Sequence, residues 1–173
     1  MEIERKFIPA SIPEEFLQDQ CYLLEQAYVQ TSPVIRVRQK ATITDGQAID
    51  PQYILTVKSS GMMARQEFEL PLTAKEYNEL LAKADGNIIT KRRYVHPITE
   101  SLILELDIFE GIFEGLIIAE IEFPDEESAK KYTPPAFLGE EVTFDSRFHN
   151  SNLSKMPPEA IKELLHSIKL FNC

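Results

Sequence analysis

Charged side chains at every second position are the feature of this sequence that most restricts its fold. Residues 2–7 read EIERKF, in which Glu2, Glu4 and Lys6 alternate with other residues, among them the apolar Ile3. Successive side chains of a β-strand point to opposite faces, so residues two apart share a face. The first predicted strand therefore places three charges together on one face.

Period-2 patterns of this kind predict eight β-strands along the chain. They cover residues 2–8, 22–31, 33–42, 52–60, 65–71, 88–96, 102–109 and 116–124. Turn-forming residues separate several of these stretches, at 44–46, 60–61 and 111–115. Because short turns join antiparallel neighbours, we expect a largely antiparallel sheet.

Helices are expected between the strands where the capping-box pattern occurs. This pattern satisfies free N–H groups at a helix start, and it is present at Ser11 with Glu14 and at Thr73 with Glu76. The second box opens a predicted helix over residues 74–84.

Two further helices are predicted toward the C-terminus. A short one is expected after Asp125, and an amphipathic one is expected after Pro158, where Ile161, Leu164 and Ile168 recur at helical spacing. The fold class is therefore α+β and mostly β, with helices packed against the sheet.

Acidic and basic residues share the charged face of the predicted strands in similar numbers. The acids are Glu2, Glu4, Glu67, Glu69, Glu105, Asp107, Glu120 and Glu122, and the bases are Lys6, Arg36, Arg38, Lys58, Arg65, Lys91 and Arg93. The residues between them, such as Val37, Val57 and Ile121, are apolar. Two arrangements fit this pattern: an open sheet whose charged face meets water, and a barrel whose charged face lines the inside.

Enclosed charges would determine what such a barrel binds, because each is costly to bury unless it is paired or binds an ion. Bases would bind an anion with several negative groups, and carboxylates would hold hard cations such as Mg²⁺ or Mn²⁺. A phosphate chain bound together with a divalent metal satisfies both demands.

Composition limits the other functions. The formal net charge of −10 opposes general nucleic-acid binding, and no apolar run is long enough to cross a bilayer. The two cysteines, Cys21 and Cys173, make no disulfide framework. We expect one cytoplasmic domain over residues 1–173 that binds a small molecule, and the sequence leaves the oligomeric state open, a dimer included.

The stretch EIERKF resembles the ExExK signature of the CYTH family, the triphosphate tunnel metalloenzymes. Further family motifs follow in order between residues 2 and 153, namely RVR, TVK, RQEFE, KRRY, LELD, AEIEF and EVTFDSRFHNSNL. The resemblance is to short bacterial tripolyphosphatase-like members. It implies an eight-stranded antiparallel β-barrel that forms a tunnel, with helices packed outside, and metal-dependent hydrolysis of a triphosphate.

The resemblance also assigns roles by position. The implied ligands of Mg²⁺ or Mn²⁺ are Glu2, Glu4, Glu120 and Glu122, assisted by Glu67, Glu69 and Asp107. The implied phosphate-binding residues are Arg36, Arg38, Lys58, Lys91 and Arg93, with Arg65 and with Arg147 of the closing motif.

Lys6 and Tyr28 match a pair that is thought to be catalytic in some short bacterial members of the family. A simple strand aromatic is the competing interpretation of Tyr28. Phe148 stands where a Tyr is commoner in the family, which removes a hydroxyl from the closing motif. The three histidines, at 96, 149 and 166, are predicted to lie at the surface or at strand edges.

Inorganic triphosphate is the substrate that the resemblance favours, because the link between the second and third predicted strands is short. A nucleoside or thiamine triphosphate follows, and cyclisation of ATP by a class IV adenylyl cyclase comes third. Two hypotheses from other classes are a non-catalytic polyphosphate-binding module and an open-sheet interaction protein. The C-terminal helix is expected either to close one tunnel mouth or to pack on the outer face.

Overall fold

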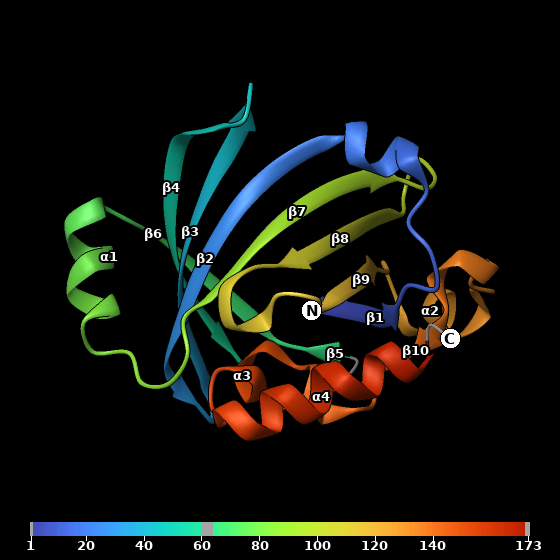
Figure 1. The fold of residues 1–173 in the computed structure, drawn as a ribbon. Helices are drawn as coiled ribbons and strands as arrows, with labels where there is room; N and C mark the ends of the chain where they lie inside the picture. The colour runs from blue at the N-terminus through green and yellow to red at the C-terminus, as the bar shows by residue number, and fades with distance from the viewer. Residues whose placement is uncertain (1, 60–63, 172–173) are drawn as a thin grey trace.

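One curved antiparallel sheet forms the body of the protein (Figure 1). This computed structural model describes residues 2–59 and 64–171, of which Glu2, Ala64, Arg65 and 169–171 are described by their backbone alone. The strands in these ranges are β1 (Glu2–Ile8), β2 (Gln20–Thr31), β3 (Val34–Thr44), β4 (Gln47–Lys58), β5 (Ala64–Arg65), β6 (Glu67–Leu72), β7 (Ile89–Pro97), β8 (Ile103–Phe109), β9 (Ile117–Glu122) and β10 (Glu140–Glu141).

The strand order is β10-β1-β9-β8-β7-β2-β3-β4-β6, with β5 paired to β1. Each of the eight predicted strands is confirmed, although the fifth is divided at Gln66 into β5 and β6. The two-residue β10 was not predicted. Adjacent strands such as β2 and β3, or β7 and β8, form hairpins, whereas β1 pairs with the distant β9.

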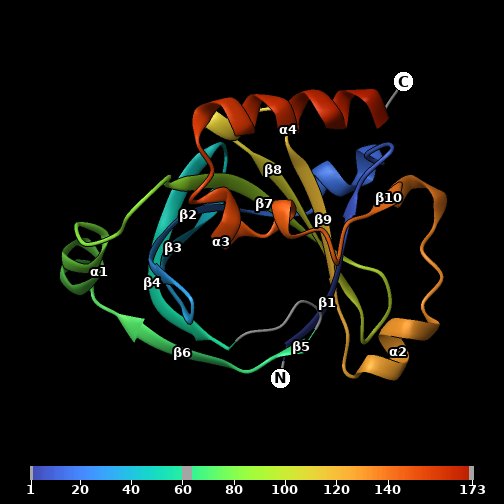
Figure 2. The same ribbon diagram turned by 90° about the horizontal axis from the view of Figure 1, so that it is seen from below.

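The two ends of the sheet approach each other through residues 64–72. Strand β6 pairs with β4, and β5 pairs with β1, so consecutive residues contact strands at opposite ends of the sheet order. The pairing is interrupted at Gln66, and the sheet is not closed into a barrel. Figure 2 shows how strongly the sheet curves between these ends. The predicted fold class, α+β and mostly β with an antiparallel sheet, is confirmed.

Four α-helices, α1 (Ala74–Leu81), α2 (Glu126–Lys131), α3 (Asn150–Leu153) and α4 (Pro158–Phe171), lie in the described ranges. Helix α1 begins with the predicted capping box of Thr73 and Glu76, and the Asp125 side chain caps α2. The capping box predicted at Ser11 is wrong, because the segment forms a 3₁₀ helix, η1 (Glu14–Gln18), that follows Pro13 without a side-chain cap. Three further 3₁₀ helices are η2 (Gly111–Phe113), η3 (Ala136–Leu138) and η4 (Ser146–Phe148).

The apolar faces of the strands are covered from outside by the helices. Tyr77 of α1 packs on Ala27 and Val37, and a second cluster joins β1, β8 and β9 to Phe16 and Ala129. This burial of apolar surface is the main stabilising contribution to the fold.

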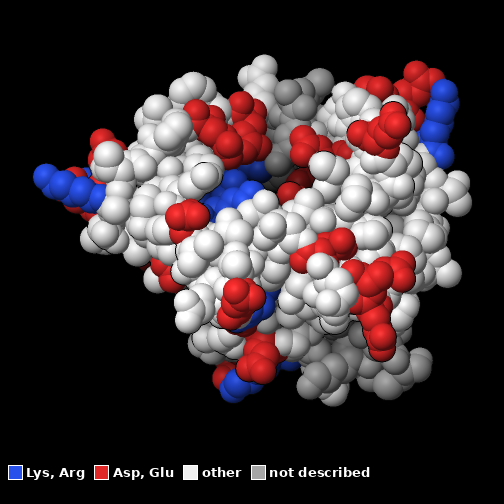
Figure 3. Space-filling model, turned by 90° about the horizontal axis from the view of Figure 1, so that it is seen from above, with Lys and Arg blue, Asp and Glu red and all other residues white. Residues whose placement is uncertain are grey.

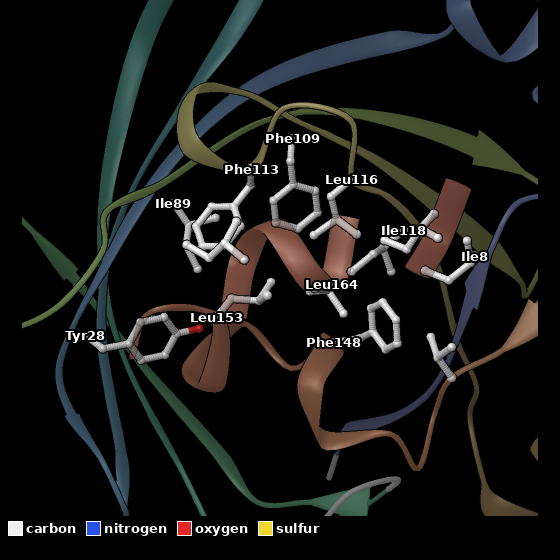
Figure 4. Packing of buried hydrophobic residues seen from close by; sticks show 13 residues of the cluster. Ile8, Tyr28, Ile89, Phe109, Phe113, Leu116, Ile118, Phe148, Leu153 and Leu164 are labelled. Atoms are coloured by element: carbon white, nitrogen blue, oxygen red, sulfur yellow. The ribbon is translucent and has the colours of Figure 1, made fainter. Parts of the chain in front are cut away.

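A third apolar cluster closes one end of the charged face (Figure 4). Tyr28, Ile89 and Phe109 each lie two positions from a charged or polar residue on the same face of β2, β7 or β8. They belong to one cluster with Leu153 of α3 and Leu164 of α4. The C-terminal helix therefore packs at that end. No helix among the described residues is long and apolar enough to span a bilayer.

Candidate functional site

The charged faces of the strands enclose a cavity of about 430 Å³. Its lining consists of Glu4, Lys6, Gln26, Tyr28, Val34, Arg36, Arg38, Lys58, Glu67, Glu69, Lys91, Arg93, Glu105, Glu120, Glu122, His149, Asn150 and Ser151. Seen from the end where β3 turns into β4, basic atoms lie in a hollow and acidic atoms lie around it (Figure 3). The charged face therefore points inward, and the open sheet with its charges in bulk water is excluded.

Strand β3 supplies the basic residues with the weakest counter-charges. Arg36 and Arg38 share the carboxylate of Glu69, at 3.9 Å and 3.6 Å, and the Glu69 side chain is 43% exposed. The Nε atoms of both arginines are buried and have no hydrogen-bond partner among the described residues. Burial, followed by repulsion from Arg36 and Arg93, lowers the pKa of Arg38 to about 10. Two incompletely compensated guanidinium groups give this wall the chemistry that suits an anion.

The centre of the cavity is held by Asp107, which is fully buried. Arg93 donates from Nε to Asp107 Oδ1 at 2.6 Å and from Nη2 to Oδ2 at 2.7 Å, and Lys91 also pairs with Asp107. A further Arg93 contact reaches Glu120 at 2.8 Å. Asp107 lies behind the two cations and not on the cavity surface. Its position thus orients basic residues, whereas the resemblance implies an assisting role at a metal.

Burial and neighbouring charges act oppositely on these two cations. Burial lowers the pKa of Lys91, because the attraction of Asp107 does not offset the loss of hydration and the repulsion of Arg93. Burial would also lower the pKa of Arg93, but Asp107 and Glu105 outweigh it and raise that pKa. Arg93 therefore remains a permanent cation in the cavity.

The opposite wall, formed by β1 and β9, carries carboxylates around Lys6. Their register places Glu4 opposite Glu122 and Lys6 opposite Glu120. The Lys6 ammonium lies 3.0 Å from Glu4 Oε1 and also pairs with Glu120. Burial alone would lower the pKa of Lys6, but the attraction of Glu120 and Glu4 raises it. These two carboxylates therefore favour the protonated, cationic form of Lys6 in this arrangement.

A hard divalent cation fits this wall by donor chemistry, since Glu4, Glu120 and Glu122 all offer oxygen ligands to one cavity. Within residues 2–59 and 64–171 as described, no three acidic, histidine or cysteine residues are grouped as metal ligands. In this arrangement the ammonium of Lys6 provides the positive charge between Glu4 and Glu120. Burial would raise the pKa of Glu120, but Lys6 and Arg93 hold it well below its usual value.

Tyr28 and His149 lie at the end of the cavity beside the apolar cluster. The Tyr28 hydroxyl accepts a hydrogen bond from Gln26 Nε2 at 3.2 Å. His149 Nε2 lies 3.2 Å from the carbonyl oxygen of Thr143, and because a carbonyl only accepts, Nε2 must carry the proton. The prediction that His149 is a surface or edge residue is wrong, since it is buried and lines the cavity.

The remaining predicted residues divide into three groups. Glu67 and Glu69 line the cavity, where Glu67 accepts from Lys58 at 2.9 Å. The side chains of Glu2 and Arg65 lie outside the described residues, although their backbones pair between β1 and β5. Arg147 is not in the lining, because it is exposed and paired with Asp145 at 2.5 Å.

Six lining residues were absent from the predicted site: Gln26, Val34, Glu105, His149, Asn150 and Ser151. Gln26 could have been found, because it lies two positions from Tyr28 on the same strand, whereas Glu105 was placed on the charged face but was given no role in the site. His149 joins η4 to α3, and Asn150 and Ser151 belong to α3, where no period-2 pattern indicates a direction. Asn150 Oδ1 is buried there and has no hydrogen-bond partner among the described residues.

Comparison with known proteins identifies the family. No family model matches the sequence. An inorganic triphosphatase of Nitrosomonas europaea is 34% identical over 160 residues, which are 91% of this chain and 99% of that protein. An inorganic triphosphatase of Acetivibrio thermocellus is 36% identical over 166 residues, covering 94% of this chain and 98% of the relative.

The chain belongs to the CYTH family of inorganic triphosphatases.

Solved structures agree with membership of the CYTH family. The crystal structure of an inorganic triphosphatase has a TM-score of 0.62 at 31% identity and covers 91% of this chain and 97% of its own. A protein from Hippeastrum, described as an adenylyl cyclase with a dominant triphosphatase activity, has a TM-score of 0.53 at 19% identity over 75% of this chain and 83% of its own. At that identity the second likeness concerns the fold alone.

Proposed function

We propose that this protein hydrolyses inorganic triphosphate to orthophosphate and a shortened chain, with a divalent metal bound to its carboxylate wall. The observation that supports this most is the cavity itself. Arg36 and Arg38 on one wall lack full counter-charges, and the other wall carries Glu4, Glu120 and Glu122. An anion binder without metal would lose these carboxylates, because they repel the ligand.

The proposed function includes a tunnel, in which the strands form a closed ring around the substrate. Residues 64–72 would close the ring by joining β4 to β1 across Gln66, so that the charged face surrounds the substrate on all sides. An enclosed site excludes water and strengthens each charge contact to the phosphates.

The metal would be Mg²⁺ or Mn²⁺, held by Glu4, Glu120 and Glu122 and, on the resemblance, by Glu2. When bound, it would polarise the phosphoryl oxygens and neutralise part of their charge. Glu67 and Glu69 lie beside the basic wall, where they would act through water.

The chain's own residues supply most of the binding. Phosphoryl transfer depends mainly on positioning and on stabilising oxygen charge, so Arg36, Arg38 and Lys58 would hold the phosphate chain. Arg93, fixed by Asp107, would contact it from the central strands. Lys6 would contribute a permanent positive charge beside the attacked phosphate, and the Tyr28 hydroxyl would orient the attacking water.

Phosphate release from tripolyphosphate is the test. We expect release with Mg²⁺ or Mn²⁺ and none with EDTA. The Arg38→Met variant should lose about 100-fold in kcat/KM, as expected when one charge-stabilising donor is removed. Lys75→Met on α1 is the matched control, because the Lys75 side chain is 85% exposed and should leave activity unchanged.

Two results would contradict the proposal. Tight binding of tripolyphosphate without release in any metal would favour a non-catalytic binding module. Formation of cyclic AMP from ATP at a higher kcat/KM than phosphate release from tripolyphosphate would favour a cyclase.

A further inference from the structure

The side-chain oxygen of Asn150 is a polar atom of the cavity to which the proposed function gives no role. Asn150 lines the cavity, and its Oδ1 is buried without a hydrogen-bond partner among the described residues. A buried acceptor that receives no hydrogen bond is unfavourable, and folded proteins rarely leave one so. We therefore expect a group with an N–H or an O–H to meet this oxygen inside the cavity.

Two hydrogen bonds hold the segment that carries Asn150 beside β1. The backbone N–H of Lys6 donates to Thr143 Oγ1 at 3.0 Å, and His149 Nε2 donates to the Thr143 carbonyl oxygen at 3.2 Å. Asn150 follows His149 directly and is the first residue of α3. The place of Asn150 is thus fixed from the strand that carries Lys6.

Asn150 also lies at the closed end of the cavity, on the side of Tyr28. Helix α3 lies against β2, the strand that carries Tyr28. Tyr28 and Leu153 of α3 belong to one apolar cluster, and the Tyr28 hydroxyl points toward Leu153 in Figure 4. The amide of Asn150 and the hydroxyl of Tyr28 therefore border the same end of the cavity.

A phosphate oxygen is not a suitable partner for Asn150 Oδ1. Ionised phosphate oxygens and an amide oxygen are both acceptors, so no hydrogen bond can form between them. A water molecule has two O–H donors and can meet the amide oxygen with one of them. Water is therefore the occupant of a phosphate-binding cavity that suits this atom.

The closed end is also where an attacking water has to lie. In phosphoryl transfer the attacking and the leaving oxygens are roughly in line on opposite sides of the phosphorus. The hollow in Figure 3 opens at the end where β3 turns into β4, and the apolar cluster around Leu153 closes the other end. A phosphate chain that enters through the hollow points its terminal phosphate at the closed end, and its leaving part points outward.

We propose that Asn150 Oδ1 accepts a hydrogen from the attacking water and, with the Tyr28 hydroxyl, positions it in line with the terminal phosphate. This inference rests on the proposed function. The water oxygen forms a bond to the terminal phosphorus, and the bridging P–O bond breaks with its electron pair remaining on the shortened chain. One hydrogen of the water stays on the orthophosphate, and the other passes as a proton to the shortened chain. Asn150 holds the water and takes no proton, because a neutral amide is a very weak base.

Phosphate release from tripolyphosphate with Mg²⁺ tests this role in variants of Asn150. Asn150→Leu removes the acceptor at similar size and should lower kcat about 100-fold, the loss expected when a reactant is misplaced by about 1 Å. KM should not change, and neither should the dissociation constant of tripolyphosphate, measured by calorimetry in EDTA. Asn150→Ala should lose as much kcat, and added formamide should restore part of it by replacing the missing carboxamide. A merely structural role of Asn150 would not respond to formamide.

Asn152→Ala is the matched control on the same helix. Asn152 is exposed and does not line the cavity, and its Nδ2 donates to the Ser146 carbonyl oxygen at 2.7 Å. This variant should keep the wild-type kcat and should not respond to formamide. Thermal unfolding verifies that each variant is folded.

Three results would overturn the role of Asn150. A wild-type kcat in Asn150→Leu would reject it alone, since phosphate release by the wild type would still support the proposed function. A weakened affinity for Mn²⁺ in Asn150→Ala, measured by electron paramagnetic resonance, would assign Oδ1 to the metal and not to the water. A wild type that releases no phosphate would reject the proposed function together with this role.

Discussion

Arg38 and Glu120 are charged residues of one cavity in opposite electrostatic environments. Arg38 lies near the cations Arg36 and Arg93, and among the described side chains it pairs with one carboxylate, at 3.6 Å. Glu120, in contrast, accepts from both Lys6 and Arg93. The first arrangement stores unfavourable energy that a substrate would release, and the second stabilises the fold.

Replacing Arg38 by Met should therefore stabilise the protein without ligand. The folded state lowers the pKa of Arg38, so at neutral pH it disfavours the charge that the unfolded chain carries freely. The free energy of unfolding should rise by about 1–3 kcal/mol in urea titrations. An equal rise in Lys75→Met would show that the gain does not come from the buried site.

Replacing Glu120 by Gln should have the opposite effect. It leaves the Lys6 charge in a buried site with less compensation and should cost about 3 kcal/mol at pH 7. The folded pKa of Glu120 is well below its usual 4.5, so its stabilisation is complete above that pH and declines as the pH falls toward the folded value.

The difference in unfolding free energy between wild type and Glu120→Gln, measured in EDTA, should therefore shrink as the pH falls below 4.5. The exposed Glu126→Gln on α2 serves as control and should give a small difference at every pH. If the difference in unfolding free energy between wild type and Glu120→Gln does not change with pH, the lowered pKa of Glu120 is contradicted.

Sequence patterns located the strand residues of the site because period 2 fixes the face of each side chain. Thus Glu4, Arg36, Lys58 and Glu122 all line the cavity as the alternation required. The pattern could not show that Asp107 lies behind Lys91 and Arg93 and not on the cavity surface. Alternation indicates which face a side chain is on, but not how far it is from the cavity. It could not place His149 either, because a loop sets its direction.

At the scale of elements, the same capping-box pattern had two outcomes. Thr73 accepts from the Glu76 backbone at 3.3 Å and caps α1, whereas Ser11 caps no helix. The difference lies in Pro13, because a residue that precedes proline is disfavoured in the helical region and Ile12 therefore cannot begin a helix. The strands themselves were predictable from alternation. The break at Gln66 was not, because it arises where β5 pairs with β1 and β6 pairs with β4, two strands that are far apart in the sequence.

The cap of α1 should make a measurable contribution to stability. Thr73→Ala removes the acceptor for Glu76 N and should lower the free energy of unfolding by about 1 kcal/mol, while Thr73→Ser should retain most of it. Chemical denaturation measures both variants. A loss in Thr73→Ser as large as in Thr73→Ala would mean that the threonine methyl group, and not the cap, is responsible.

Gly139, just before β10, is required for both backbone angle and space. Its φ is +68°, and an added Cβ would lie 2.3 Å from the carbonyl oxygen of Ile8. Gly46 has a φ of +78° with no atom within 4 Å of such a Cβ. Gly46→Ala should therefore cost about 1 kcal/mol, and Gly139→Ala should cost clearly more because a clash is added. Equal shifts in the denaturation midpoints would exclude the clash.

At the scale of the whole molecule, the pairing of β1 with β5 is a short contact between the two ends of the curved sheet. Among the described residues it comprises two residue pairs, whereas β4 and β6 share six. Backbone amides of residues 64–65 should exchange with solvent faster than those of β9, and tripolyphosphate with Mg²⁺ should slow them. Exchange that is fast and unaffected by the ligand would argue that these residues do not enclose the substrate.

The pairing of β1 with β9 also affects when the site can exist during synthesis. Lys6 leaves the ribosome early, but its partner Glu120 is 114 positions later, and Asn150 and Ser151 follow still later. Contacts of such long sequence separation form slowly and late in folding. Neither the carboxylate wall nor the closed end can therefore assemble on a short nascent chain, and the cavity is complete only after residues up to Ser151 have been synthesised.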